Sequence, residues 1–237
     1  MRSLPSDQNM VDTTAYEGDI QLVFSQVYLL MTLGLVITAI VAAGIASNPR
    51  LVEELFFSSP WMLLGLFVVQ LVVVIALTAA ITRLSAAMAT GLFILYSALT
   101  GVTISVIFLI YTDASIATTF LVTAGTFGAM SVFGYVTKRD LTKLGNLLIM
   151  LLLGFVVASL VNLFLNSATL YWILTFAGIG IFVGLIAYDT QRIKRMAASG
   201  LATGQSRSAV AILGALRLYL DFINLFLLML RLAGRRR

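Results

Sequence analysis

Seven long apolar runs divide the chain, and no other feature of the sequence constrains its fold as strongly. The runs lie at residues 22–46, 61–82, 86–110, 114–136, 144–165, 170–188 and 209–232. A transmembrane helix needs about 20 consecutive apolar residues to cross the hydrocarbon core of a bilayer. Because the apolar residues are continuous rather than alternating, they predict helices and not the strands of a barrel. The sequence therefore predicts an all-α membrane protein, a seven-transmembrane helical bundle.

The composition leaves little room for a separate soluble domain. Of the 237 residues, 60% are hydrophobic and 11% are charged, whereas a soluble domain has about 25% charged residues. We divide the chain into a polar cytoplasmic tail at residues 1–21 and a seven-helix transmembrane domain at residues 22–237. The tail is acidic and unlike a cleavable signal peptide, so we expect the first span to direct insertion.

Lysine and arginine residues gather in alternate loops, which predicts the orientation of the bundle. Arg83 follows the second run, Lys138, Arg139 and Lys143 follow the fourth, and residues 192–207 add further basic side chains after the sixth. By the positive-inside rule, the amino terminus and these loops face the cytoplasm. The loops also account for the net charge of +5, so no nucleic-acid partner is expected.

The last run is the exception to this pattern. Arg235, Arg236 and Arg237 follow it, and a full crossing would put them outside. Either the last segment crosses fully in spite of its basic tail, or it re-enters and returns to the side from which it started. We favour the full crossing because the orientation signals from the earlier loops outweigh a single opposing signal.

Two residue types are absent from the whole chain, and their absence excludes several kinds of site. The sequence contains no cysteine and no histidine. It therefore has no disulfides, no thiolate or imidazole metal ligands and no Ser-His-Asp triad. We expect no bound cofactor.

Small residues four apart occur within the apolar runs. Gly180 and Gly184 form one such pair, and Ser97 and Gly101 form another. In membranes, small residues at this spacing let two helix backbones approach closely. Gly178 and Gly180 are not part of a nucleotide-binding fingerprint, because that fingerprint connects a strand to a helix. We predict that these residues serve helix packing.

Three ionisable residues lie in apolar surroundings: Asp189, Arg217 and Asp221. A charge at the centre of a membrane helix costs about 2.5–3.5 kcal/mol on insertion scales, so such residues usually serve a function. Asp189 comes at the cytoplasmic end of the sixth run, and Asp221 lies within the seventh. A cytoplasmic loop joins the two runs, so we expect antiparallel neighbours with both carboxylates in the same half of the membrane.

Whether the two carboxylates meet depends on where the last helix begins. A start near Ala209 puts Asp221 about 18 Å deep at about 1.5 Å per residue, too deep to touch a residue at the end of the preceding span. A start near Leu216 brings Asp221 within range of Asp189 but leaves the last span short.

Two aspartates that meet form a site with a defined chemistry. Carboxylates in contact titrate as a unit, and no single pKa belongs to either of them. When both are ionised they offer the hard oxygen ligands that calcium prefers, and protonation removes that affinity. We therefore predict that Asp189 and Asp221 bind a cation, with calcium as the metal, and sense pH. Arg83, at the cytoplasmic end of the second run, is positioned to clamp one carboxylate.

A purely structural interpretation of these charges stays open at this point. Arg217 precedes Asp221 by four residues, so the two could form a salt bridge on one helix face. Asp189 would then be an interfacial residue that faces Arg192 or Lys194.

An intramembrane aspartyl protease is disfavoured by the sequence around the two aspartates. Tyr188-Asp189 matches the first motif of these enzymes, but Tyr219-Leu220 stands where their second motif needs Gly-x-Gly before the aspartate. The Pro-Ala-Leu element is also missing, because no proline follows Pro60. We expect the chain not to be an enzyme and to have no catalytic residues.

Several short motifs resemble the Bax inhibitor-1 family in its bacterial branch. They lie at residues 97–101, 128–131, 137–141, 187–191 and 218–226, and the most specific are Ala-Tyr-Asp-Thr-Gln and Leu-Tyr-Leu-Asp-Phe-Ile-Asn. The resemblance runs from about Val23 to the carboxyl terminus. It implies a seven-helix fold whose last helix is central and surrounded by the other six, in a multi-pass protein of the bacterial inner membrane.

The resemblance also implies a function. Members are described as pH-sensitive calcium leak channels controlled by an aspartate pair, and Asp189 and Asp221 match that pair. The latching arginine of the family falls near Arg83. Arg217 occupies a position that is usually small or polar, so its charge is expected to weaken cation affinity or to shift the pH response. The implied partners are the lipid bilayer, calcium and protons.

A second class of function is kept as an alternative. Some bacterial relatives are linked to membrane-bound ATP-dependent proteases, as substrates or modulators that recognise a cytoplasmic amino-terminal tail. The polar stretch at residues 1–19 fits such a role. The alternative is therefore a non-transporting membrane regulator with a membrane protease as its partner.

Overall fold

The structure is a computed structural model that describes residues 6–56, 60–199 and 204–237. These residues are almost entirely helical, and the described ranges contain no β-strand beyond one isolated bridge between Tyr111 and Arg236. In chain order the helices are α1 (Ser6–Ala46), α2 (Pro49–Phe56), α3 (Pro60–Ala80), α4 (Ala86–Ile104), α5 (Ile107–Ile110), α6 (Asp113–Val136), α7 (Thr142–Leu165), α8 (Ala168–Ala198) and α9 (Gly204–Ala233). The predicted all-α fold is confirmed.

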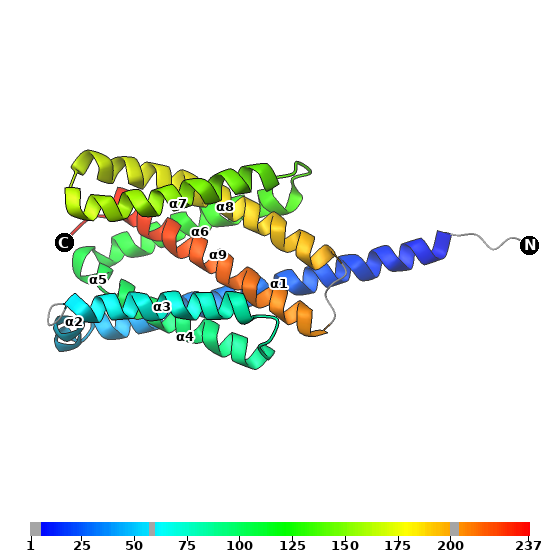
Figure 1. Ribbon diagram of the computed structural model, residues 1–237, viewed down its shortest axis with the longest axis horizontal. Helices are drawn as coiled ribbons and strands as arrows, with labels where there is room; N and C mark the ends of the chain where they lie inside the picture. Colours follow the sequence, from blue (N-terminus) through cyan, green and yellow to red (C-terminus); the bar gives the residue numbers. More distant parts are fainter. Residues whose placement is uncertain (1–5, 57–59, 200–203) are drawn as a thin grey trace, which may run out of the picture.

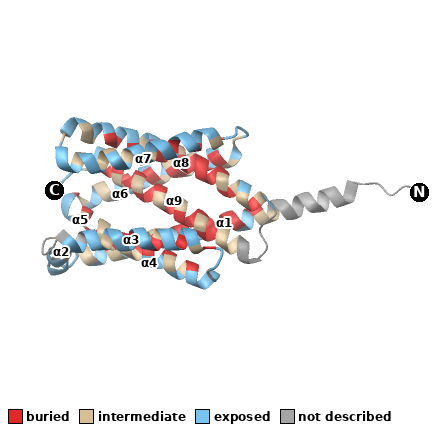
Figure 2. Ribbon diagram, in the orientation of Figure 1, coloured by how far each residue is buried: buried red, intermediate tan, exposed pale blue. Residues whose placement is uncertain are grey.

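Six helical segments within the described residues are long and apolar enough to cross a bilayer. They are Gly18–Ala46, Ala86–Ile110, Asp113–Val136, Thr142–Leu165, Ala168–Ala198 and Arg207–Ala233. Helix α3 is also apolar along its length, and Leu64–Ala80 is the continuous apolar stretch of it whose side chains the structure describes. Exposed residues lie along the outside of the bundle (Figure 2), and many of them are large and apolar; Phe164, for example, is 87% exposed. A surface of this kind is stable against lipid and not against water, so the fold is that of a multi-pass membrane bundle.

Two helices extend beyond the apolar runs that predicted them. Helix α1 begins at Ser6 and therefore includes most of the predicted polar tail, 1–21. Helix α8 continues ten residues beyond Tyr188 to Ala198, because the polar residues after Tyr188 include strong helix formers and no glycine or proline interrupts them. Asp189 therefore lies well inside a helix and not at its end, and its predicted position at the end of the membrane span stays a prediction.

Helix α9 is the most buried of the six candidate spans. In its most apolar stretch 67% of the residues are buried, compared with 6% in α7. It packs against α1, α4, α6 and α8, and it runs diagonally between the α3–α4 side and the α7–α8 side (Figure 1). Because α9 is one continuous helix from Gly204 to Ala233, the alternative in which the last segment turns back does not fit.

The last four residues, 234–237, form a carboxyl-terminal strap beside the start of α6. The Thr112 N–H donates to the Arg235 carbonyl at 3.1 Å, and the Arg237 N–H donates to the Ile110 carbonyl at 2.9 Å. The Arg237 guanidinium lies 2.8 Å from the Asp113 carboxylate. The basic tail is therefore held at the end of the bundle opposite the last turns of α8 (Figure 1).

The small residues singled out in the sequence differ in what they contact. A Cβ on Gly101 would meet the Thr38 carbonyl of α1, and one on Gly184 would meet the Leu148 side chain of α7, so both permit close approach of two helices. Gly180 has open space around it, and the packing role predicted for it is wrong. The physical reason is that Gly180 faces outward, one turn of helix away from the contact made by Gly184.

Candidate functional site

The two aspartates singled out in the sequence lie together inside the bundle. Asp189 of α8 is 7% exposed and Asp221 of α9 is 5% exposed. Their carboxyl groups lie close enough to act on each other through charge and hydrogen bonding. The contact forms although α9 begins early, because the extension of α8 to Ala198 carries Asp189 away from the helix end to a matching depth.

Arg217 joins this pair from one side. Its Nη1 lies 3.3 Å from Oδ1 of Asp189, so the ion pair connects α9 to α8. The structural alternative, a salt bridge between Arg217 and Asp221 along α9, is not formed among the described residues. Instead, Oδ2 of Asp221 is buried and has no hydrogen-bond partner in the described part of the chain.

Of the other basic residues considered as partners of Asp189, only one lies close to it. Arg192 lies close enough to act on Asp189 through its charge. Lys194 turns away, because its Nζ donates to the Tyr135 carbonyl at 2.8 Å and lies 4.4 Å from the centre of the Tyr135 ring. Arg83 is exposed in the turn after α3, and no described interaction connects it to either aspartate.

The charges of this site do not balance in its immediate contacts. Two buried carboxylates face one guanidinium, and that guanidinium belongs to a side chain that is 30% exposed. Removing ionised groups from water is costly unless they are paired and hydrogen-bonded. The site can lower this cost by taking up a proton or a cation, and its oxygen atoms suit a hard cation such as calcium. The described residues contain no cluster of three or more acidic side chains, so any such cation would be held loosely.

Close approach of α6 and α7 fixes the backbone of α8 just before Asp189. A Cβ on Gly134 of α6 would overlap the Ala187 carbonyl, and one on Gly145 of α7 would overlap the Tyr188 ring. Thr190, on the other side of Asp189, contacts α6 through its hydroxyl, which lies 3.3 Å from that of Ser131. Helix α8 is therefore closely held on both sides of the carboxylate.

Gln191 ties the same part of α8 to the loop between α6 and α7. Its amide N–H donates to the Arg139 carbonyl at 2.8 Å, and its Oε1 accepts the Leu141 N–H at 2.9 Å. In that loop, Asp140 accepts hydrogen bonds from Thr142 and pairs with Arg195. The Thr142 hydroxyl and N–H, followed by the Arg195 guanidinium, lower the pKa of Asp140 to about 2.

Tyr219 positions α9 two residues before Asp221. The Tyr219 side chain is fully buried, and its hydroxyl lies 2.6 Å from the Thr38 hydroxyl of α1. The Thr38 hydroxyl also lies 2.9 Å from the Ser97 carbonyl of α4. One polar contact therefore ties α9 to α1 and α4 at the level of the site.

Sequence reasoning missed the residues that position the aspartates. Gln191 and Tyr219 stand within the motifs that carried the family resemblance, but their own contacts were not predicted. Thr38 gave only a weak signal, because the same run also contains Ser25, Gln26 and Thr32. Gly134 and Gly145 gave none, since no second small residue accompanies either of them at the spacing typical of close helix pairs.

Comparison with known proteins gives matches over nearly the whole chain. A family model described as "Inhibitor of apoptosis-promoting Bax1" matches residues 20–237, which include both aspartates. The Escherichia coli K12 protein named inner membrane protein YbhL is 52% identical over 238 residues, covering 100% of both chains. An uncharacterized protein of Borreliella burgdorferi is 43% identical over 231 residues, covering 96% of this chain and 99% of that one. An uncharacterized membrane protein of Streptococcus pyogenes serotype M1 is 36% identical over 213 residues, covering 90% and 92%.

Proposed function

Because the chain belongs to the Bax inhibitor-1 family of membrane proteins, we propose that it is a pH-sensitive calcium leak channel controlled by Asp189 and Asp221. The observation that carries the proposal is the contact between two buried carboxyl groups, one of which has a buried oxygen without a partner among the described residues. Such a pair attracts a cation that crosses the membrane. It carries no catalytic function in this proposal, and no cofactor takes part.

The small number of ligands in the site favours passage of calcium through it over tight binding of calcium. Calcium takes about six to eight oxygen ligands in its protein sites, three to four times as many as two carboxylates supply with one oxygen each. Conduction requires that an ion bind well enough to enter and weakly enough to leave. A two-aspartate site inside the bundle meets both conditions, because its charge attracts calcium and its small ligand set does not retain it.

In this proposal Arg217 acts as a built-in competitor for calcium. Its guanidinium lies at Oδ1 of Asp189, where a cation would bind. Calcium must therefore displace Arg217 or share the carboxylate with it. We assign the role of latch to Arg217 in the described conformation, and Arg83 would act only after a rearrangement that brings it from the surface to the pair.

The proposed pH sensitivity follows from competition between protons and cations for the same oxygens. Protonation of either aspartate removes a negative charge from the site and also weakens the hold of Asp189 on Arg217. Loss of negative charge lowers the attraction for calcium, whereas release of Arg217 opens its binding position. Because both effects depend on the protonation of the pair, the proposal requires a pH-dependent flux that disappears when the pair is neutralised.

We extend the proposal to the topology of the chain. In it, α3 provides the seventh crossing, α9 is the central helix, and the protein lies in a bacterial inner membrane with a cytoplasmic amino terminus. The burial of α9 and its packing on four neighbours support the central position. The name of the Escherichia coli relative supports the location. Basic loops at one end of the bundle support the orientation.

Calcium flux into dye-loaded vesicles tests the proposal. The purified full chain is compared with Asp189→Asn, Asp221→Asn and the matched control Asp113→Asn, which neutralises an exposed aspartate at the opposite end of the bundle. We expect calcium entry in the parent and in the control, dependent on pH, and entry at the level of empty vesicles in the two site variants. Equal, pH-dependent flux in all four proteins would exclude the proposal.

Regulation of a membrane-bound ATP-dependent protease is the second candidate. The observation that favours it is the continuity of α1, which begins at Ser6 although the apolar run of the sequence begins only at residue 22. A helical extension ahead of the membrane gives a protease or another partner a defined segment to recognise. Deletion of residues 2–17 tests this candidate: it should abolish the association with the protease in cells and leave calcium flux in vesicles unchanged.

A further inference from the structure

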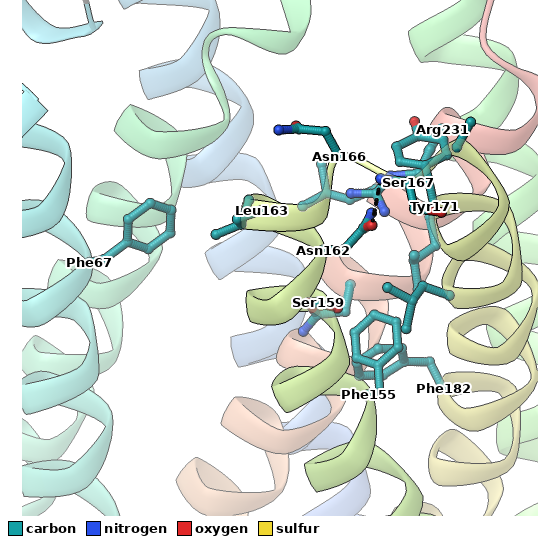
Figure 3. A pocket seen from close by; sticks show the side chains of 15 residues that line it. Phe67, Phe155, Ser159, Asn162, Leu163, Asn166, Ser167, Tyr171, Phe182 and Arg231 are labelled. Carbon is teal, nitrogen blue, oxygen red and sulfur yellow. Dashed lines mark hydrogen bonds between the residues drawn. The ribbon is translucent and has the colours of Figure 1, made fainter.

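A second concave site lies at the other end of α9, away from the aspartates. It is a groove of about 740 Å³ between α3, α7, α8 and α9. Figure 3 shows its polar side chains gathered around Arg231 at one end and the aromatic side chains of Phe155 and Phe182 at the other. The proposed channel does not use this groove, and none of the sequence patterns predicted it.

The polar end of the groove is arranged to receive an anion. The guanidinium of Arg231 stacks on the ring of Tyr171, with its Cζ 4.7 Å from the ring centre. Stacking occupies the face of the guanidinium and leaves the N–H donors along its edge available. Arg231 forms no ion pair within the described residues. The amide of Asn162 accepts the Ser167 N–H through its oxygen at 3.1 Å, and its NH2 group has no described partner.

The rest of the groove is apolar and open to lipid. Phe155 and Phe182 line its deeper part, and Leu163 and Phe67 line its sides. Leu163 is 69% exposed and Phe67 is 54% exposed, so both border the space that lipid tails fill. The turn at Asn166 and Ser167 marks the end of the bundle at this level. The polar end therefore lies at the membrane surface and the aromatic end points toward the bilayer centre.

The groove exists because α9 is left uncovered here. Helix α3 packs mainly on α4 and α2, and α7 packs on α8, so neither forms an extensive contact with the outer half of α9. Figure 1 shows α9 between these two helices. A cation is a poor occupant, because Arg231 at the polar end would repel it. An occupant needs a negative head and an apolar body.

We propose that this groove binds a phospholipid, with the anionic headgroup at Arg231 and an acyl chain along Phe155 and Phe182. The charge, the gradient from polar to aromatic lining and the opening toward the lipid all match such a molecule. Binding of the lipid requires neither conduction nor the aspartate pair, so the proposal is independent of the proposed channel function.

Native mass spectrometry of the full-length protein, purified in detergent and mixed with phosphatidylglycerol, tests the proposal. The first variant, Arg231→Gln, removes the headgroup contact. The second, Ser159→Phe, fills the middle of the groove at a residue that forms no described hydrogen bond. The matched control is Arg50→Gln, which removes an exposed arginine of α2 outside the groove. Retained helicity by circular dichroism shows that each variant is folded.

We expect the parent and Arg50→Gln to retain the lipid equally. Arg231→Gln should bind it on the order of tenfold more weakly, the usual effect of losing a charge-assisted hydrogen bond, and Ser159→Phe should also lose it. An excess of glycerol phosphate, which has the headgroup chemistry without the tails, should not displace it. Equal retention by Arg231→Gln and Arg50→Gln, retention by Ser159→Phe, or displacement by glycerol phosphate would each overturn the proposal.

Discussion

Charged side chains near the start of α9 and those just beyond its end lie in opposite settings. Toward its start, Arg217 is partly exposed, whereas Asp221 is buried and one of its oxygens has no described partner. Beyond its end, Arg237 pairs with Asp113 at the surface, where the two side chains are 51% and 75% exposed. Water screens the second pair, so it contributes at most about 1 kcal/mol to stability. No such screening is available to the first set. The difference teaches that burial, and not the number of ion pairs, distinguishes the residues to which we assign the proposed function.

The largest effect is expected from Asp221→Asn. Removal of the buried charge should reduce calcium flux to the background and stabilise the fold by about 1–3 kcal/mol, because an unpartnered buried charge is replaced by a neutral group of the same shape. Asp113→Asn, the exposed counterpart, should change stability by no more than about 1 kcal/mol. Thermal unfolding and vesicle flux measure both quantities. A destabilised Asp221→Asn with normal flux would break the comparison.

Arg217→Gln should have the next largest effect, in the opposite direction. Loss of the guanidinium frees Oδ1 of Asp189 for calcium, so flux should rise on the order of tenfold, the weight of one charge-assisted hydrogen bond. Arg195→Gln is the matched control, because Arg195 pairs with the exposed Asp140 on the same end of the bundle. A similar rise in both variants would show that general surface charge, and not the pair, limits flux.

Tyr219→Phe tests how the inner half of α9 is positioned. The substitution removes the hydroxyl that contacts Thr38 and keeps the ring, and it should cost about 1–3 kcal/mol of unfolding free energy. Tyr111→Phe is the control, because the Tyr111 hydroxyl forms no described hydrogen bond at the opposite end of the bundle. Equal stability of the two variants would mean that the polar contact between α1 and α9 is not needed to hold the site.

The smallest effect is expected from Asp140→Asn. This substitution distinguishes titration of a surface carboxylate from titration of the buried aspartate pair. Hydrogen bonds from Thr142, followed by Arg195, lower its pKa from the ordinary 3.8 to about 2. The contribution of its carboxylate to folding is therefore complete above the ordinary value and is lost as the pH falls through about 2. Asp140→Asn should alter the stability–pH curve only on this acid limb. A change in the pH profile of calcium flux near neutrality would contradict the assignment of pH sensing to Asp189 and Asp221.

Much of the fold follows from the sequence because a membrane limits what an apolar run can form. Continuous runs predicted the helices, and the cost of intramembrane charge identified Asp189 and Asp221. Helix ends were predicted less well, since α8 continues through polar residues that hydropathy assigns to a loop and that favour helix nevertheless. Which residues contact the two aspartates depends on the relative rotation and depth of neighbouring helices, and the local sequence does not encode these. It therefore left Arg83, Arg192 and Lys194 open as the cation at Asp189 and did not indicate Arg217, nor did it show that α3 and α7 leave a groove at Arg231.

A double-mutant cycle of calcium flux tests most directly whether the two aspartates act as one site. Flux is measured for the parent, Asp189→Asn, Asp221→Asn and the double variant in the same vesicles. If the carboxylates work as a unit, the double variant should conduct no less than either single variant, because the first substitution already abolishes the site. Two partial losses that multiply in the double variant would show that the aspartates act independently, and this result would contradict the central role of their contact.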